Sequence, residues 1–309
     1  METVLVVLNQ VVIMLLLLLV GVLLFKVKMI NEEGRKQLVN IALYVSTSAV
    51  IIDSFLMDFN KDLALNILYC LILAVISHTI GIALVTLFIR KKNERYQVLR
   101  FAGVFANCGF MGIPLIQAVL GPSGVIYATV FVTVFNVFVW TYGVILCSGK
   151  TEKGMIKKIV LSPVLICVAI GLILFIFSIR LFAPIEKTIE YIADLNTPLA
   201  MIATGACVAN SNFFKAFLRK ETYVILGIRL FAVSVIMMFV LKLFSFVSYE
   251  VAMTTVIISA APTASNTAMF AEKYNLGSDR AGELVVVSTI LSLVSIPLIT
   301  ALYSFVGAF

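Results

Sequence analysis

The stretch Ala106-Asn107-Cys108-Gly109-Phe110-Met111-Gly112-Ile113-Pro114 decides the fold, because it interrupts an apolar segment that runs from about Val98 to Leu120. Gly and Pro are the weakest helix formers, and Pro also lacks a backbone donor. In hydrocarbon, a broken backbone must find partners in protein or in a water-filled cavity. The break is therefore predicted to lie inside a helical bundle, at a place where something binds.

A second break, Ser259-Ala260-Ala261-Pro262-Thr263-Ala264-Ser265-Asn266, interrupts another apolar segment. Pro114 and Pro262 lie 148 positions apart, close to half of the 309 residues. A pair of broken spans in corresponding positions of two halves points to the central site of a transporter.

The composition predicts an all-α polytopic membrane protein. The chain is 62% hydrophobic and 13% charged, with a mean hydropathy of +1.12. Soluble domains are about half apolar and about a quarter charged. The first apolar segment, Val4 to Phe25, is too long for a signal-peptide core and has no basic region before it. It is expected to be a retained transmembrane helix.

Ten apolar spans of membrane-crossing length are predicted. They cover about 4–25, 38–57, 63–89, 98–120, 123–147, 159–181, 191–211, 222–245, 249–271 and 281–306. The polar stretch 148–158 marks the midpoint and is expected to be a cytoplasmic connector. It divides the chain into two five-helix units, 1–147 and 159–309.

The net charge of +7 reflects membrane topology and not nucleic-acid binding. Eighteen of the 23 Lys and Arg residues fall in the loops that follow the odd-numbered spans. The positive-inside rule places those loops in the cytoplasm and both termini outside the cytoplasmic (inner) membrane. Because five is odd, the second unit enters the membrane upside down, which predicts a 5+5 inverted repeat. A weak sequence similarity between the two units supports that repeat. Span two starts with Asn40-Ile41-Ala42-Leu43, and span seven starts with Asn196-Thr197-Pro198-Leu199.

Three segments resemble motifs of the auxin efflux carrier family. They are 100–115 with its Asn-x-Gly-Phe-Met-Gly-x-Pro run, 196–201 and 259–266. The resemblance covers nearly the whole chain, and the short connector is similar to the bacterial branch, which includes proposed malonate and other organic-anion permeases. It implies ten helices, two crossed broken helices, a scaffold part and a mobile transport part, an organic anion as substrate, and a possible homodimer. One departure is the absence of the second-helix proline, since 40–51 contains none.

The breaks supply the candidate substrate contacts. Broken helices expose N–H groups that favour anions, and they free carbonyls that can hold cations. Asn107 and Asn266 offer amide groups there, or they merely cap the half-helices. Asn136 either faces the site or bonds a neighbouring helix, and Asn196 either contacts substrate or caps span seven. The full set of substrate candidates is Asn107, Gly109, Pro114, Asn136, Asn196, Pro262 and Asn266.

Two ionisable residues inside spans are candidates for coupling transport to an ion, with H⁺ or Na⁺ as the possible coupling ions. His78, the single histidine, could carry a proton, although a neutral histidine bonded between helices is the favoured interpretation. Arg229 in span eight is expected to snorkel toward the cytoplasmic face, with a carboxylate pair as the alternative.

An enzyme is not expected. The chain has no HExxH, no GxSxG beside a triad and no phosphate-binding loop. Its five cysteines form no CxxC pair, so neither a metal site nor another cofactor is predicted. The favoured function is a secondary active or facilitative transporter of a small organic anion, working by elevator-like alternating access. The alternatives are an anion channel and a membrane sensor or interaction protein that does not transport.

Overall fold

The computed structural model describes residues 2–90, 94–150, 154, 157, 160–209 and 218–306, and this part of the chain is helical apart from its connections and one isolated β-bridge. Its α-helices (α) and short π-helical turns (η) are α1 (Glu2–Lys26), α2 (Glu32–Ile41), η1 (Ala42–Ser46), α3 (Thr47–Phe55), α4 (Lys61–Phe88), α5 (Glu94–Val104), η2 (Cys108–Gly112), α6 (Ile113–Phe138), η3 (Val139–Gly143), α7 (Val144–Ser148), α9 (Pro163–Ile176), α10 (Ala183–Asp194), α11 (Asn196–Val208), α13 (Lys220–Gly227), η4 (Ile228–Ala232), α14 (Val233–Leu243), α15 (Tyr249–Ser259), α16 (Asn266–Lys273) and α17 (Ser278–Val306).

The helices establish a multi-pass membrane protein. Within the described residues, six helical stretches are long and apolar enough to cross a bilayer. They are Thr3–Lys26, Glu32–Phe55, Lys61–Phe88, Cys108–Ser148, Lys220–Leu243 and Asp279–Val306. Two shorter apolar helices, Pro163–Ile176 and Tyr249–Ser259, accompany them. The ten-span count and the 5+5 inverted repeat stay predictions.

The first break is real, but it lies earlier than the glycines and the proline suggested. Helix α5 ends at Val104, the chain is non-helical from 105 to 107, and helical structure resumes at Cys108. Pro114 is the second residue of α6, and helical structure runs through it without a gap from the π turn η2. The amides of Met111 and Gly112 both bond to the carbonyl of Asn107, in the π turn η2.

The second break lies where the sequence placed it. Helix α15 ends at Ser259 and α16 begins at Asn266, so six residues between them are non-helical. Ala260 and Ala261 still bond back to α15, since their amides reach the carbonyls of Ile257 and Ile258. Both interrupted spans are thus true breaks and not bends in continuous helices.

Other boundaries differ from the predicted ones. Spans four and five are separated by a single sharp bend at Gly121, whose φ of +69° favours glycine. The second apolar helix begins at Glu32 instead of 38, because Asn31 caps α2 by accepting a bond from Gly34 N. The helix α10 was not predicted; it is amphipathic and has no buried residues.

Helices α1 and α11 pack unusually close to each other. A Cβ on Gly21 would lie 2.2 Å from the carbonyl oxygen of Ile202, and one on Gly205 would lie 2.0 Å from that of Leu18. Only glycine allows two helix backbones to approach this closely. The pair therefore behaves as one rigid unit of the fold.

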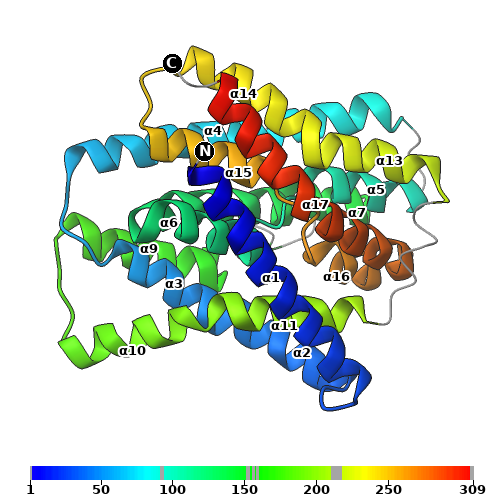
Figure 1. Cartoon of the computed structure of the whole chain (residues 1–309), viewed down its shortest axis with the longest axis horizontal. Helices are drawn as coiled ribbons and strands as arrows, with labels where there is room; N and C mark the ends of the chain where they lie inside the picture. Colours follow the sequence, from blue (N-terminus) through cyan, green and yellow to red (C-terminus); the bar gives the residue numbers. More distant parts are fainter. Residues whose placement is uncertain are drawn as a thin grey trace.

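The helices divide into two groups by their packing. One group contains α1, α2, α3, α9, α10 and α11, which pack mainly on one another. The other contains the helices α4 to α7 and α13 to α17. Figure 1 shows α2, α3, α10 and α11 along one border of the molecule and α4, α13, α14 and α15 along the opposite one, with α1 and α17 running diagonally between them. Helices α1 and α17 pack against each other in antiparallel orientation, so both ends of the described chain lie near one end of this pair.

Candidate functional site

The two breaks cross each other and are joined by backbone hydrogen bonds. The amide of Asn107 donates to the carbonyl of Pro262 at 2.7 Å, and the amide of Ala264 donates to the carbonyl of Phe105 at 2.8 Å. These bonds flank an antiparallel bridge between Ala106 and Thr263. The broken backbones thus satisfy part of their hydrogen-bonding capacity through each other, as the apolar surroundings require.

Arg229 satisfies three more carbonyls at the crossing. Its guanidinium donates to Val104 O at 2.9 Å, to Ala261 O at 3.0 Å, and to Ser259 O. The side chain lies in the π turn η4 and is 2% exposed. Both expectations for Arg229 were therefore wrong: it neither snorkels nor pairs with a carboxylate of the described chain, because the freed carbonyls of the breaks hold it in the interior.

Thr263 and Ser288 complete the junction. The hydroxyl of Thr263 donates to Ala102 O at 3.0 Å, and its amide donates to Ser288 Oγ at 3.1 Å. Both residues are fully buried. The junction therefore connects α5 with α17 as well as with the second broken span.

A cavity of about 890 Å³ lies against the crossing; we call it the central cavity. Its wall comes from η1 and the start of α3, both breaks, the end of α6 with η3, the start of α9, and α16. It is lined by Leu43, Tyr44, Thr47, Ala106, Asn107, Cys108, Gly109, Phe110, Val132, Phe135, Asn136, Val139, Trp140, Gly154, Lys157, Leu161, Ser162, Pro163, Val164, Ala264, Ser265, Asn266, Met269, Phe270 and Lys273. The cavity thus lies between the two groups of helices.

Four of the predicted substrate contacts line this cavity: Asn107, Gly109, Asn136 and Asn266. The other three, Pro114, Pro262 and Asn196, do not line it, and neither do His78 and Arg229. Pro262 contributes instead through its carbonyl at the crossing, and Pro114 lies in the first turn of α6. The sequence identified the breaks correctly but could not say which residues of each break face the open space.

Asn107 combines a capping role with a place in the cavity wall. Its Oδ1 accepts a hydrogen bond from Phe110 N at 3.3 Å, and its Nδ2 donates to Ser265 Oγ at 3.4 Å. The first bond caps the restarted helix. The second links the two broken spans through their side chains. Both interpretations of Asn107, cap and cavity residue, are therefore compatible with its position.

The amide of Asn136 bonds within its own helix, since Nδ2 donates to Val132 O at 2.8 Å. It does not bond a neighbouring helix in the described structure, and its Oδ1 remains available on the cavity wall. Asn266 opens α16 and is partly exposed to the same cavity. Two amide side chains from different spans thus face one space.

Asn196 is not the cap of α11 that its position suggested. The helix already includes Asn196, and its Oδ1 instead accepts a hydrogen bond from Thr47 Oγ1 at 3.0 Å. The residue is 2% exposed, and its Nδ2 has no hydrogen-bond partner among the described residues. Because Thr47 lines the cavity, Asn196 lies directly behind the wall.

His78 lies in an aromatic environment away from the cavity. Its Nδ1 is 2.8 Å from Ala74 O on the same helix, and its ring stacks on Phe138 with centroids 5.1 Å apart. The rings of Phe105 and Phe135 are also close. The expected bond between helices is therefore replaced by a bond within α4 and by ring contacts.

Sequence reasoning missed the charged wall of the cavity. Lys157 and Lys273 had been counted only as topology signals, yet they are the two charged side chains among its described lining residues. The ammonium of Lys273 lies 5.7 Å from the ring of Trp140 and 4.9 Å from that of Tyr274. The single tryptophan of the chain was the available signal, since aromatic rings favour a nearby cation.

A second cavity of about 950 Å³ lies on the other side of α16; we call it the flanking cavity. It shares Phe110, Ser265, Asn266, Met269 and Lys273 with the central cavity. Its charges are mixed, because its wall carries Glu32, Glu272, Asp279 and Glu283 as well as Arg35, Lys36 and Lys273. An anion in the flanking cavity would be repelled by the carboxylates as well as attracted by the basic side chains.

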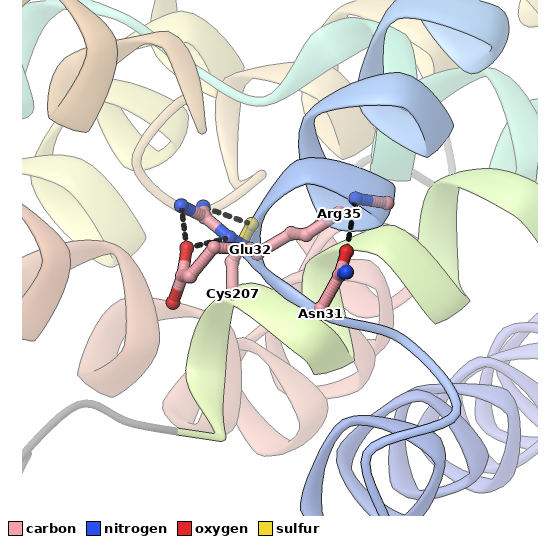
Figure 2. A network of polar contacts seen from close by, with 5 residues as sticks. Asn31, Glu32, Arg35 and Cys207 are labelled. Carbon is pink, nitrogen blue, oxygen red and sulfur yellow. Dashed lines mark hydrogen bonds and ion pairs between the residues drawn. The ribbon is translucent and has the colours of Figure 1, made fainter.

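Figure 2 shows a polar network on the wall of the flanking cavity. Arg35 pairs with Glu32 at 2.7 Å and donates to Cys207 Sγ at 3.3 Å. Asn31 accepts a bond from Gly34 N at 2.7 Å beside it. The network joins the start of α2 to the end of α11, both within one group of helices. It therefore stabilises that group and does not bridge to the other.

Known proteins resemble this chain along most of its length. Residues 6–157 and 152–300 match the family described as membrane transport protein. An "Uncharacterized transporter" of Methanothermobacter thermautotrophicus is 27% identical over 293 residues, which are 92% of this chain and 94% of that protein. A "Putative malonate transporter" of Rhizobium meliloti is 23% identical over 220 residues, which are 68% of each chain.

The matches agree with the geometry. A multi-pass helical chain with two crossed breaks beside a cavity has the parts of a carrier, and its relatives are transporters and not enzymes. The chain belongs to the membrane transport protein family, the family of the auxin efflux carriers.

Proposed function

We propose that this transporter carries a small organic anion, a mono- or dicarboxylate of about the size of malonate, and that the anion binds in the central cavity. The observation that carries the proposal is the charge of the cavity. Its described wall contains two lysines and no acidic side chain, whereas the flanking cavity contains four acidic residues. A cavity lined by one sign of charge concentrates ions of the opposite sign.

The polar groups of the cavity suit a carboxylate. The restarted helices beginning at Cys108 and Asn266 both open onto it, and the first N–H groups of a helix lack intrahelical acceptors. Asn107, Asn136 and Asn266 add amide groups. The volume falls within the range of about 300–1,000 Å³ that is usual for small-molecule sites.

The name of one relative supports the choice of malonate as a probe. The Rhizobium meliloti protein is named for malonate, and it covers 68% of this chain. The same residues would accept another small carboxylate.

The position of the cavity between two groups of helices supports a mechanism of alternating access. We propose that α4 to α7 and α13 to α17 move with the crossing against the group that contains the rigid α1–α11 pair. The central cavity reaches Lys157 and Lys273, two of the basic residues that the charge count places on the cytoplasmic side. If those loops are cytoplasmic, this structure is the inward-facing state, with both termini outside.

The test is uptake of radiolabelled malonate into proteoliposomes by wild type, Asn107→Ala and Asn60→Ala. Asn60 is the matched control, because it caps α4 by accepting a bond from Asp62 N at 2.8 Å but is exposed and outside the cavity. We expect Asn107→Ala to raise the KM about tenfold, as the loss of a hydrogen bond to a charged group does. Asn60→Ala should transport like wild type.

Three outcomes would contradict the proposal. Equal uptake by Asn107→Ala and wild type would remove Asn107 from the site. Malonate flux that does not saturate would indicate a channel, and no flux of any small carboxylate would favour a sensor or interaction protein.

A further inference from the structure

We infer that Arg229 is a fixed internal cation that joins the two broken spans and supplies positive charge behind the anion site. It acts as a positioning and electrostatic residue, without touching the substrate. The part of this inference that concerns charge rests on the proposed function. The part that concerns the junction stands independently of it.

The contacts of Arg229 connect both halves of the crossing. One bond goes to Val104 O, at the end of the helix before the first break. The other two go to Ala261 O and Ser259 O, at the end of the helix before the second break. The planar guanidinium presents five N–H donors in a fixed fork, and it can therefore hold three carbonyls in one geometry.

These carbonyls would otherwise remain without partners in an apolar interior. Carbonyls freed by a broken helix coordinate a cation in many carriers. Here the side chain of Arg229 takes that place, so a metal ion is not needed to hold the crossing together. The side chain comes from η4, a third span, and it therefore ties α13 and α14 to the crossing as well.

The charge of Arg229 has no carboxylate partner in the described structure. Its hydrogen bonds go to the three carbonyls, whose dipoles stabilise the cation but leave its net charge uncompensated. Val104 is two residues before Ala106, and Ala261 is three residues before Ala264; both Ala106 and Ala264 line the central cavity. Two of the carbonyls that hold Arg229 thus lie two or three residues along the chain from the cavity wall, and a charge in a poorly screened interior acts over longer distances than an exposed one.

The test of the junction needs no substrate. Hydrogen exchange of the detergent-purified full chain is compared among wild type, Arg229→Lys and Arg229→Met, for the peptides that contain the donors Asn107 and Ala264. We expect exchange in both peptides to be about tenfold faster or more in Arg229→Met, because three charged bonds are lost. Arg229→Lys keeps the charge but not the fork, so its exchange should be intermediate.

Arg100→Met is the matched control. Arg100 is also a buried arginine bonded to backbone carbonyl, but both of its bonds go to the single carbonyl of Ile89, outside the breaks. It should leave exchange at Asn107 and Ala264 unchanged. If Arg229→Met does not yield folded protein, Arg229→Lys decides, since faster exchange in both peptides is still expected there. The proposed junction would be refuted if both peptides of Arg229→Lys exchanged at the wild-type rate, or if only one of its two peptides exchanged faster.

The test of the charge is malonate uptake by the same variants. We expect the KM of Arg229→Lys to stay within about threefold of wild type and that of Arg229→Met to rise about tenfold or more, with the Arg100→Met control unchanged. Equal KM values for Arg229→Lys and Arg229→Met would refute the electrostatic role. If wild type transports no malonate, the substrate proposal fails by itself, and the exchange experiment still decides the junction.

Discussion

Gly205→Ala tests the close contact between α1 and α11. The added Cβ would lie 2.0 Å from Leu18 O, whereas real Cβ atoms almost never come within 3.0 Å of another heavy atom. The obstacle is a backbone carbonyl inside a helix, so a side-chain rotation cannot relieve it. The two helices must separate locally by about 1 Å, which is the difference between these two distances.

The cost of this shift can be estimated from overpacking. Forcing an extra methyl group into a close-packed interior typically costs about 1–3 kcal/mol. The neighbouring contact at Gly21, where a Cβ would lie 2.2 Å from Ile202 O, prevents the helices from sliding to a better position. We therefore expect Gly205→Ala to lower the free energy of unfolding by about 1–3 kcal/mol and the apparent melting temperature by several degrees.

The assay is thermal unfolding of the detergent-purified protein, with Gly227→Ala as the control. Gly227 also lies in a helix with ordinary helical dihedral angles, and a Cβ there meets nothing within 4 Å. Alanine is a better helix former than glycine by up to about 1 kcal/mol, so the control should melt at the wild-type temperature or above it. A Gly205→Ala protein as stable as wild type would show that α1 and α11 are farther apart than described here.

Two further predictions concern buried polar groups. Thr47→Val removes the hydroxyl that donates to Asn196 Oδ1 and Ala42 O, and we expect this substitution to lower the free energy of unfolding by about 1–3 kcal/mol. The control is Thr188→Val, at an exposed residue whose hydroxyl donates to Pro184 O. In the thermal-unfolding assay the control should be nearly as stable as wild type. His78→Gln should lower the free energy of unfolding by about 0.5–1.5 kcal/mol, because the contacts with the rings of Phe105, Phe135 and Phe138 are lost. It should leave the pH dependence of malonate uptake unchanged, because His78 does not line the central cavity. A flattened pH profile would instead make His78 a proton carrier.

The sequence predicted the membrane class and the existence of both breaks because these properties are local. Long apolar runs require helices in a bilayer, and the second break appears at 260–265 as expected. The first break was misplaced by a few residues. Gly109, Gly112 and Pro114 are weak helix formers, but all three lie within continuous helical structure, the glycines in the π turn η2 and Pro114 just after it.

The assignment of individual side chains needed the tertiary structure. Asn196 was expected either to contact substrate or to cap a helix that in fact includes it, and its actual partner, Thr47, lies 149 positions away in the sequence. Lys157 and Lys273 follow different spans and meet at one cavity. No local pattern encodes such meetings, because they depend on how the spans pack.

The amino-acid sequence by itself determined that this chain crosses membranes as helices and that two of its apolar spans are interrupted. Only the folded arrangement decided that the interruptions bond to each other and that Arg229 lies inside, on their carbonyls. The physical reason is that hydrophobicity and backbone propensity are properties of each segment. The partner of a freed carbonyl is whichever donor the packing of distant segments brings within reach.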